Sequence, residues 1–372
     1  MFQIIRREIL LLVIITVAAV PMYMLTRKVA DLNRKRNANI AAYWYRQGEQ
    51  QLSEGKSEAA IASLRQAATN DRDNPQFAFA LAQALAATNR DDEARLALQR
   101  LRESEPENPQ INLELARLSA RSRDLPQALY YYHHSLYGLW AGEGVDEQRR
   151  QVRLELIHLL LDRKERSRAL AELLVLSSDT PPTSEAQLQL AQLFMTAGDS
   201  SRALQHFTEA ARLDVRNVAA LSGAGEAAFQ LGDYKNAERY LDQAVEQDKS
   251  AKRAAQLLEK TRLIESSDPL AAHLSRREQA RRLAAALAQS VKRLQQCLDA
   301  KYGAVKELLR SQAQTILPGI TAEYLREDPE LLRAGAEVVF KIEETTSQTC
   351  GEPVGLDEAL LLIGRKHGAS ER

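Results

Sequence analysis

The chain has 372 residues, which is enough for two or three domains, and aromatic residues make up only 5% of it. Lys and Arg together number 50, as do Asp and Glu, so the formal net charge is zero. This balance gives no indication of nucleic-acid or other polyanion binding by the protein as a whole.

An apolar run without charged residues begins at Ile9, contains Pro21 and ends at Leu25. As a helix, residues 9–25 would extend about 25 Å, somewhat less than the ~30 Å core of a bilayer. We therefore expect residues 1–28 to form an uncleaved transmembrane anchor. The alternatives are a cleaved signal peptide and a buried core helix. Residues 29–40 are polar and basic, and we expect them to form a juxtamembrane spacer or to continue the helix.

The charged residues on the two sides of this run favour opposite orientations of a single-pass membrane protein. Lys and Arg are denser after the run, which favours a cytoplasmic body, but Arg6 and Arg7 before it oppose that orientation. The chain's only two cysteines favour an oxidising compartment. We expect an extracytoplasmic body, with a cytoplasmic body as the alternative.

Residues 41–251 repeat a pattern of about 34 residues six times, in repeats that start at residues 41, 75, 109, 150, 184 and 218. The pattern predicts two short amphipathic helices per repeat, helix A and helix B. Small residues mark the positions where the two helices cross, because close packing there excludes large side chains. The eighth position holds Gly48, Ala82, Ala116, Ile157, Ala191 and Gly225, and the twentieth holds Ala60, Ala94, Ala128, Ala169, Ala203 and Ala237. The twenty-fourth holds the large residues Leu64, Leu98, Tyr132, Leu173, Phe207 and Leu241.

Turn residues agree with this pattern. Gly55, Gly198 and Gly232 fall between helix A and helix B, where a positive φ favours glycine. The chain resembles the tetratricopeptide-repeat family over residues 41–251, most closely at Ala82, Ala94, Pro106, Gly225, Gly232, Tyr234, Ala237 and Ala244. The resemblance implies an all-α fold, a right-handed α-solenoid of about six helix pairs. Ser135 and Ile157 replace alanines that the family pattern expects.

The resemblance also implies that helix A of each repeat lines the concave face of the solenoid. An apolar stripe would run there beside a ladder of polar residues of mixed sign, which suits an amphipathic or extended peptide. The alternative is that these side chains pack on neighbouring helices or on the chain's own ends. The residues expected to line this groove are Tyr45, Glu49, Leu52, Phe79, Gln83, Leu113, Arg117, Leu154, His158, Leu188, Gln192, Met195, Glu226 and Phe229.

An aromatic cluster lies between the third and fourth repeats, at Tyr130, Tyr131, Tyr132, Tyr137 and Trp140. We expect these rings to stabilise an irregular junction between repeats, with an exposed contact patch as the alternative. The neighbouring His133 and His134 would point about 100° apart on a helix, so they cannot jointly hold a metal without other ligands.

The rest of the chain is predicted to be helical. Residues 252–267 form one helix that caps the last repeat, as solenoids require. Residues 268–372 form a helical C-terminal module, in which Asp268 is an N-cap followed by proline. A disulfide between Cys297 and Cys350 would close a loop of about 53 residues and stabilise the fold by ~4 kcal/mol in the chain-entropy model. The alternative is two unrelated buried thiols.

No segment carries a recognisable catalytic, nucleotide or metal motif; the glycines at Gly223 and Gly225 lack the strand that a dinucleotide site needs. We expect no enzyme activity, cofactor, small-molecule substrate or nucleic-acid partner. We expect a bacterial-type, membrane-tethered scaffold that binds a protein or peptide partner in the groove. The alternatives are a chaperone-like binder of many unfolded clients and an enzyme with an unrecognised site in the C-terminal module. A deep polar pocket with perturbed titratable groups would favour the enzyme.

Overall fold

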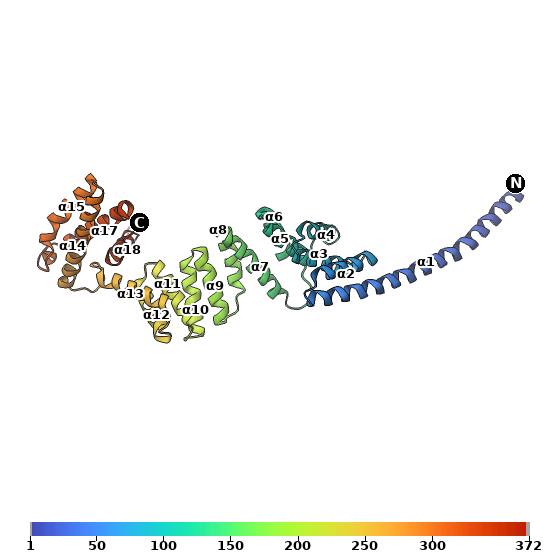
Figure 1. Ribbon diagram of the computed structural model, residues 1–372, viewed down its shortest axis with the longest axis horizontal. Helices are drawn as coiled ribbons and strands as arrows, with labels where there is room; N and C mark the ends of the chain where they lie inside the picture. The colour runs from blue at the N-terminus through green and yellow to red at the C-terminus, as the bar shows by residue number, and fades with distance from the viewer. Residues whose placement is uncertain (1, 370–372) are drawn as a thin grey trace. The chain divides into compact units, whose positions relative to one another are not determined.

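The computed structural model describes the backbone of residues 2–369 and the side chains of residues 19–368. Within these residues the chain is all-helical, with no strand (Figure 1). The helices are α1 (Phe2–Ser53), α2 (Ser57–Asn70), α3 (Pro75–Ala87), α4 (Asp91–Ser104), α5 (Pro109–Arg121), α6 (Leu125–Leu136), α7 (Val145–Asp162), α8 (Arg166–Ser178), α9 (Ser184–Ala197), α10 (Ser200–Leu213), α11 (Val218–Gln230), α12 (Tyr234–Gln247), α13 (Lys252–Ser267), α14 (Arg276–Ala300), α15 (Ala304–Ile316), η1 (Leu317–Gly319), α16 (Tyr324–Glu327), α17 (Glu330–Cys350) and α18 (Leu356–Ala369).

The chain divides into two compact units, an N-terminal unit (Met1–Arg163) and a C-terminal unit (Lys164–Arg372). The pairs α1 with α2, α3 with α4 and α5 with α6 pack within the N-terminal unit, and α9 with α10 and α11 with α12 pack within the C-terminal unit. The helices α7 and α8 of the fourth repeat belong to different units. The solenoid-like architecture expected from the sequence is confirmed. Four helices A begin at Pro75, Pro109, Ser184 and Val218, and α7 begins at Val145, five residues before the expected start. The finer division into domains stays a prediction.

The N-terminal segment differs from expectation. Residues 29–40 are an uninterrupted part of α1, which includes Pro21 and is 52 residues long. Within the described residues, no helix combines the length and the apolar content that crossing a bilayer requires, because charged residues such as Arg27, Lys28 and Asp31 follow Leu25. The expected transmembrane helix and single-pass membrane localisation are therefore corrected. The part of the expected anchor at residues 9–18 lies outside the described side chains.

Buried small residues lie at the twentieth and eighth positions of the repeats, where the helices pack closely. All six alanines at the twentieth position of the repeats have no exposed surface. At the eighth position, a methyl group on Gly48 would lie 2.7 Å from Leu64 Cγ, and one on Gly225 would lie 2.5 Å from Leu241 Cγ. Leu64 and Leu241 occupy the twenty-fourth position of the same two repeats. The small residue of helix A therefore makes room for the large residue of helix B, as close interior packing demands.

The turn between helix A and helix B has a residue with positive φ at the same position of every repeat. Its fifteenth residue has a positive φ of 75° at Gly55, 89° at Gly198 and 75° at Gly232. The other three repeats use non-glycine residues in this conformation, with φ of 59° at Asn89, 62° at Arg123 and 60° at Lys164. The backbone geometry is therefore kept even where the residue that favours it is absent.

Side-chain caps set where many of the helices begin. The side-chain amide oxygens of Asn74 and Asn108 accept from backbone N–H groups at the starts of α3 and α5. The carboxylates of Asp199 and Asp233 do the same for α10 and α12. Such caps satisfy backbone donors that have no partner inside the helix, and each typically contributes about 1 kcal/mol.

The C-terminal module packs onto the last repeat. Helix α13 contacts α12 and α18, and α17 contacts α14, α15 and α18 (Figure 1). Tyr234 of the last repeat and Ile264 of α13 lie in the same core as Leu287, Ile342 and Ile363 of the module. The repeats and the module of this unit therefore share one continuous apolar core.

Candidate functional site

The helix A face of the N-terminal unit is formed by α1, α3, α5 and α7, and carries nine of the residues expected to line a groove. Glu49, Gln83 and His158 are exposed, and Leu154 is buried. The others are half-buried, as expected of side chains that line a surface rather than fill a core: Tyr45, Leu52, Phe79, Leu113 and Arg117.

A chain of polar contacts joins three of these helices. Gln83 Nε2 of α3 donates to Glu114 Oε1 of α5 at 3.3 Å. Arg117 Nη1 donates to the same oxygen at 2.9 Å, and its Nε and Nη2 donate to Glu155 of α7 at 3.0 and 2.5 Å. Because the guanidinium is engaged on both sides, Arg117 links the repeats and is not available as a clamp for a partner's carboxylate.

The electrostatics of this face follow from those contacts. Hydrogen bonding to Glu155, together with the charges of Glu114 and Glu155, holds the pKa of Arg117 above its ordinary value against the effect of burial. Burial raises the pKa of Tyr132 to about 12, with a further contribution from Glu155. Glu114 and Glu155 were absent from the residues expected to line the groove. Both occupy the sixth position of their repeats, but the other repeats hold Arg46, Ala80, Gln189 and Gly223 there, so no repeated residue type marks this position.

The aromatic end of this face lies at α1 and α3. The rings of Tyr45 and Phe77 lie 5.1 Å apart, and Phe77 is buried beneath the surface. Burial raises the pKa of Tyr45, and the nearby charge of Glu49 raises it further. At neutral pH, Tyr45 therefore presents a neutral hydroxyl group, and its ring packs against the buried ring of Phe77.

The C-terminal unit has its own helix A face, which carries Leu188, Gln192, Met195, Glu226 and Phe229. Gln192 is exposed, and the other four are half-buried. The centroid of the Phe229 ring lies 5.3 Å from that of the Tyr234 ring and 5.3 Å from Lys260 Nζ of α13. Glu226 accepts from Arg253 at 2.6 Å. At this end, the face is therefore partly covered by the chain's own capping helix α13.

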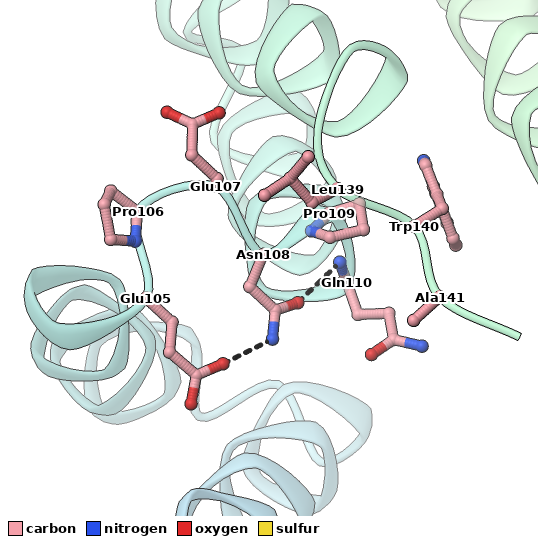
Figure 2. A pocket seen from close by; sticks show the side chains of 9 residues that line it. All are labelled: Glu105, Pro106, Glu107, Asn108, Pro109, Gln110, Leu139, Trp140 and Ala141. Carbon is pink, nitrogen blue, oxygen red and sulfur yellow. Dashed lines mark hydrogen bonds between the residues drawn. The ribbon is translucent and has the colours of Figure 1, made fainter.

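A hollow of about 360 Å³ lies where the connection between α4 and α5 meets the segment that follows α6. Figure 2 shows Pro109 near its centre in this view, with Trp140 to one side and Glu105 and Pro106 to the other. Its lining also includes Gln110, at the second position of helix A, so the hollow adjoins the helix A face. The lining residues are Glu105, Pro106, Glu107, Asn108, Pro109, Gln110, Leu139, Trp140 and Ala141.

Hydrogen bonds fix the walls of this hollow. Trp140 Nε1 donates to the Ser135 carbonyl oxygen at 2.8 Å, and Leu139 N–H donates to the Glu107 carbonyl oxygen at 3.1 Å. Asn108 accepts from Gln110 N–H at 3.0 Å while its Nδ2 donates to Glu105 at 2.7 Å, as the dashed lines in Figure 2 show. Of the described residues that line the hollow, two are carboxylates and none is a cation, and the Trp140 ring is half-buried.

The aromatic cluster around this hollow is divided. Tyr131 and Tyr132 are buried, as expected for rings that stabilise a junction between repeats. Tyr130 and Tyr137 are exposed. Tyr130 accepts from Arg102 at 2.8 Å, which ties α6 to α4. The cluster therefore supplies both junction packing and exposed aromatic surface.

A second, larger hollow of about 900 Å³ lies in the C-terminal module between α14, α17 and α18. His367 lines it and lies 3.1 Å from the buried Asp268 carboxylate. Burial raises the pKa of Asp268, but hydrogen bonds from His367 and the Leu270 N–H outweigh it and hold that pKa below its ordinary value. An Asp–His pair can orient a general base, but among the residues that the structure describes no serine, threonine or cysteine lines this hollow as a nucleophile. Among the described residues, no group of acidic, histidine or cysteine side chains is arranged to hold a metal ion.

Family comparison agrees with the repeat geometry. Two tetratricopeptide-repeat family models match residues 51–118 and 188–257. The chain carries tetratricopeptide repeats. Such repeats generally mediate protein–protein interactions, and their fold is typical of non-enzymatic scaffolds. A search of curated proteins finds no match.

Several solved structures resemble the chain at low sequence identity. YrrB, described as a TPR protein with an unusual peptide-binding site, is 15% identical, with a TM-score of 0.41 over 53% of this chain and 97% of its own. PilF of Pseudomonas aeruginosa is 16% identical, with a TM-score of 0.41 over 60% and 99%. PilW, a type IV pilus biogenesis factor, is 18% identical, with a TM-score of 0.40 over 59% and 98%. At these scores, the likenesses do not bear on the function of this chain.

Proposed function

We propose that the helix A face of the N-terminal unit binds a segment of a partner protein. The observation that supports this most directly is the pairing of half-buried apolar side chains with exposed polar ones on consecutive helices. Phe79 and Leu113 offer apolar contacts on α3 and α5, while Glu49 and His158 offer polar contacts at the two ends. Apolar anchors give affinity to such a surface, and polar neighbours set the register of the bound segment.

The contacts among Gln83, Glu114, Arg117 and Glu155 support the same function in another way. They hold α3, α5 and α7 together before any partner binds. A surface that is already ordered loses less conformational entropy on binding, which favours affinity. The polar chain therefore acts as a support for the binding surface, while the apolar side chains beside it make the contacts.

The hollow beside Gln110 extends this surface. Its carboxylates, Glu105 and Glu107, and the ring of Trp140 favour a basic side chain of the partner, which can pair with a carboxylate and lie against the indole. Leu139 is 78% exposed at its rim and would cover the aliphatic part of that side chain. We place a lysine or arginine of the bound segment here.

The proposal is tested by partner capture with matched variants of the full chain. The double variant Phe79→Glu and Leu113→Glu places two charges among the apolar contacts and should abolish capture, while circular dichroism stays unchanged. Leu96→Glu is the control, because Leu96 is an exposed leucine on α4, a helix B. We expect one stoichiometric partner that is lost with the double variant and kept with the control. Unchanged capture by a folded double variant would refute the proposal, and many substoichiometric clients would favour the chaperone-like alternative.

A further inference from the structure

Cys297 and Cys350 form a disulfide in the structure, with Cα atoms 5.7 Å apart, and the two sulfurs lie in different surroundings. Cys297, near the end of α14, is only 3% exposed. Cys350 is the last residue of α17 and is exposed. Of the two residues, Cys350 is therefore the more accessible to a reagent from solution.

The ammonium group of Lys306, on α15, faces this disulfide from inside the module. Lys306 is only 5% exposed, and its Nζ lies 3.5 Å from Cys297 Sγ and 4.0 Å from Cys350 Sγ. The same nitrogen donates to the carbonyl oxygen of Lys301. Within the described part of the chain, no carboxylate pairs with Lys306. A buried ammonium without a counter-charge is costly, so a negative charge at the neighbouring sulfur would stabilise it.

We propose that Cys297 and Cys350 form a site of thiol–disulfide exchange, in which a dithiol reductant attacks Cys350 and Cys297 leaves as a thiolate held by Lys306. The direction follows from access and from the leaving group. Attack occurs at the sulfur that can be reached, and the thiol whose anion is better stabilised leaves faster. Both considerations select the same polarity for this bond.

The exchange proceeds in two steps. A thiolate of the reductant forms a bond to Cys350 Sγ while the bond between the two protein sulfurs breaks, and that electron pair remains on Cys297 as a thiolate. The second thiolate of the reductant then attacks its own bound sulfur and closes the reductant's disulfide. Cys350 leaves as a thiolate and takes a proton from water. The protein disulfide gains two electrons, and the dithiol loses them.

The module has other contacts that hold these helix ends after reduction. Arg293 Nε donates to Thr346 Oγ1 at 2.9 Å, and Arg293 Nη2 donates to the carbonyl oxygen of Gly351 at 3.0 Å. The two helices also pack through the core residues Leu294 and Ile342. We therefore expect the opened pair to stay close and to re-form the disulfide when an oxidant is added.

The polarity is tested on the unchanged full chain. The oxidised protein is treated briefly with glutathione, a monothiol, then quenched with acid and alkylated, and the modified cysteines are located by mass spectrometry. We expect glutathione on Cys350 and the alkyl group on Cys297 in most of the product. An equal distribution, or glutathione mainly on Cys297, would overturn the proposal.

The role of Lys306 is tested by the rate of reduction with dithiothreitol. Lys306→Met should slow reduction on the order of fivefold because the leaving thiolate loses its counter-charge. Lys306→Arg should restore most of the rate, and Lys301→Met, which removes an exposed ammonium nearby, should leave it unchanged. Equal rates for Lys306→Met and the unchanged protein would contradict the assignment. Should Lys306→Met fail to fold, the location of the glutathione still decides the polarity.

Discussion

At the residue scale, the turn between helix A and helix B shows how a repeat keeps its geometry when its sequence changes. A residue with a side chain adopts the left-handed backbone conformation at a free-energy cost of about 1–2 kcal/mol, which glycine does not incur. Arg123 and Lys164 adopt this conformation at the position that Gly55, Gly198 and Gly232 occupy in other repeats. The third and fourth repeats therefore contain strained turns that their neighbours avoid.

Replacing a strained turn residue with glycine should stabilise the protein. We expect Arg123→Gly to raise the free energy of unfolding of the N-terminal unit by up to about 1 kcal/mol, since relief of strain exceeds the entropy that glycine costs. Gly198→Ala should have the opposite sign and a similar size. Urea denaturation of each variant measures both changes. A loss of stability for Arg123→Gly would show that the turn is not strained.

A buried carboxyl group in the C-terminal module should make that unit's stability depend on pH. Burial raises the pKa of Glu343 to about 7, with a further contribution from Asp357, although Ser290 and Arg293 oppose the shift. Ser290 Oγ donates to one carboxyl oxygen at 2.6 Å, while the other oxygen is buried without a hydrogen bond among the described residues. As pH rises, the unfolded chain loses this proton near its ordinary pKa of 4.5, whereas the folded state keeps it up to about pH 7.

The sign of this dependence follows from the raised pKa. Between pH 4.5 and about 7, Glu343 binds more protons in the folded state than in the unfolded state. Its contribution to the free energy of unfolding is therefore fully present at low pH and is lost as pH rises through this range. We expect Glu343→Gln to gain stability relative to the unchanged protein between pH 5 and pH 8, by an amount on the order of 3 kcal/mol. Burial lowers the pKa of His206 in the same unit, which acts in the opposite direction, so the difference between the two proteins is the quantity to measure. Parallel curves for the two proteins would contradict the assignment.

At this scale, the sequence indicates residues whose positions are restricted by side-chain volume, but it does not indicate which charged residues pair. The alanines from Ala60 to Ala237 are buried because no other residue fits where the helices cross, and that restriction leaves a periodic trace in the sequence. The contact between Arg117 and Glu155 leaves no such trace, because either residue would be acceptable on an exposed helix without the other. The left-handed turns at Asn89, Arg123 and Lys164 were missed because only glycine indicates that conformation by its identity.

At the scale of elements, Arg117 joins α5 to α7 across the insertion that separates the third and fourth repeats. Removing its charge would leave Glu114 and Glu155 facing each other without a cation between them. We expect Arg117→Gln to lower the stability of the N-terminal unit by about 1 kcal/mol, a modest value because the guanidinium is partly exposed to solvent. Arg65→Gln is the control, because its pair with Glu93 also joins two helices but is more exposed.

The two variants are compared by urea denaturation at low and high salt. Arg65→Gln should change stability by less than about 0.5 kcal/mol. The loss for Arg117→Gln should persist in part at high salt, since hydrogen bonds as well as charges are removed. Equal effects of the two substitutions would show that Arg117 has no special place between the repeats.

The sequence also anticipated elements better than their surroundings. The module is helical as expected, and α14 and α17 contribute to its core. The expected N-cap at Asp268 is wrong, because Asp268 is the C-cap of α13 and α14 begins at Arg276 after the N-cap Ser275. The hollow beside Trp140 was not anticipated, because it depends on how the segment after α6 folds back against the start of α5. Contacts between residues far apart in the sequence decide such a feature, and no local pattern records them.

At the scale of the whole molecule, two compact units carry different features. The N-terminal unit holds the helix A face and the adjoining hollow, which we propose as a binding surface for a partner. In the C-terminal unit, α13 covers part of the helix A face, and the last repeat shares a core with the module that holds the disulfide. We therefore expect partner binding and thiol exchange to be separable, with each variant set affecting one and not the other.

The most direct measurement is site-specific photo-crosslinking with a benzophenone amino acid in place of Leu113 or of Leu96 in the full chain. Leu113 lies on the helix A face, and Leu96 is 57% exposed on α4. We predict one crosslinked partner from position 113 that disappears when Phe79→Glu is added, and no such product from position 96. The same products from both positions, or a product from position 96 alone, would contradict the proposal that the helix A face is the binding surface.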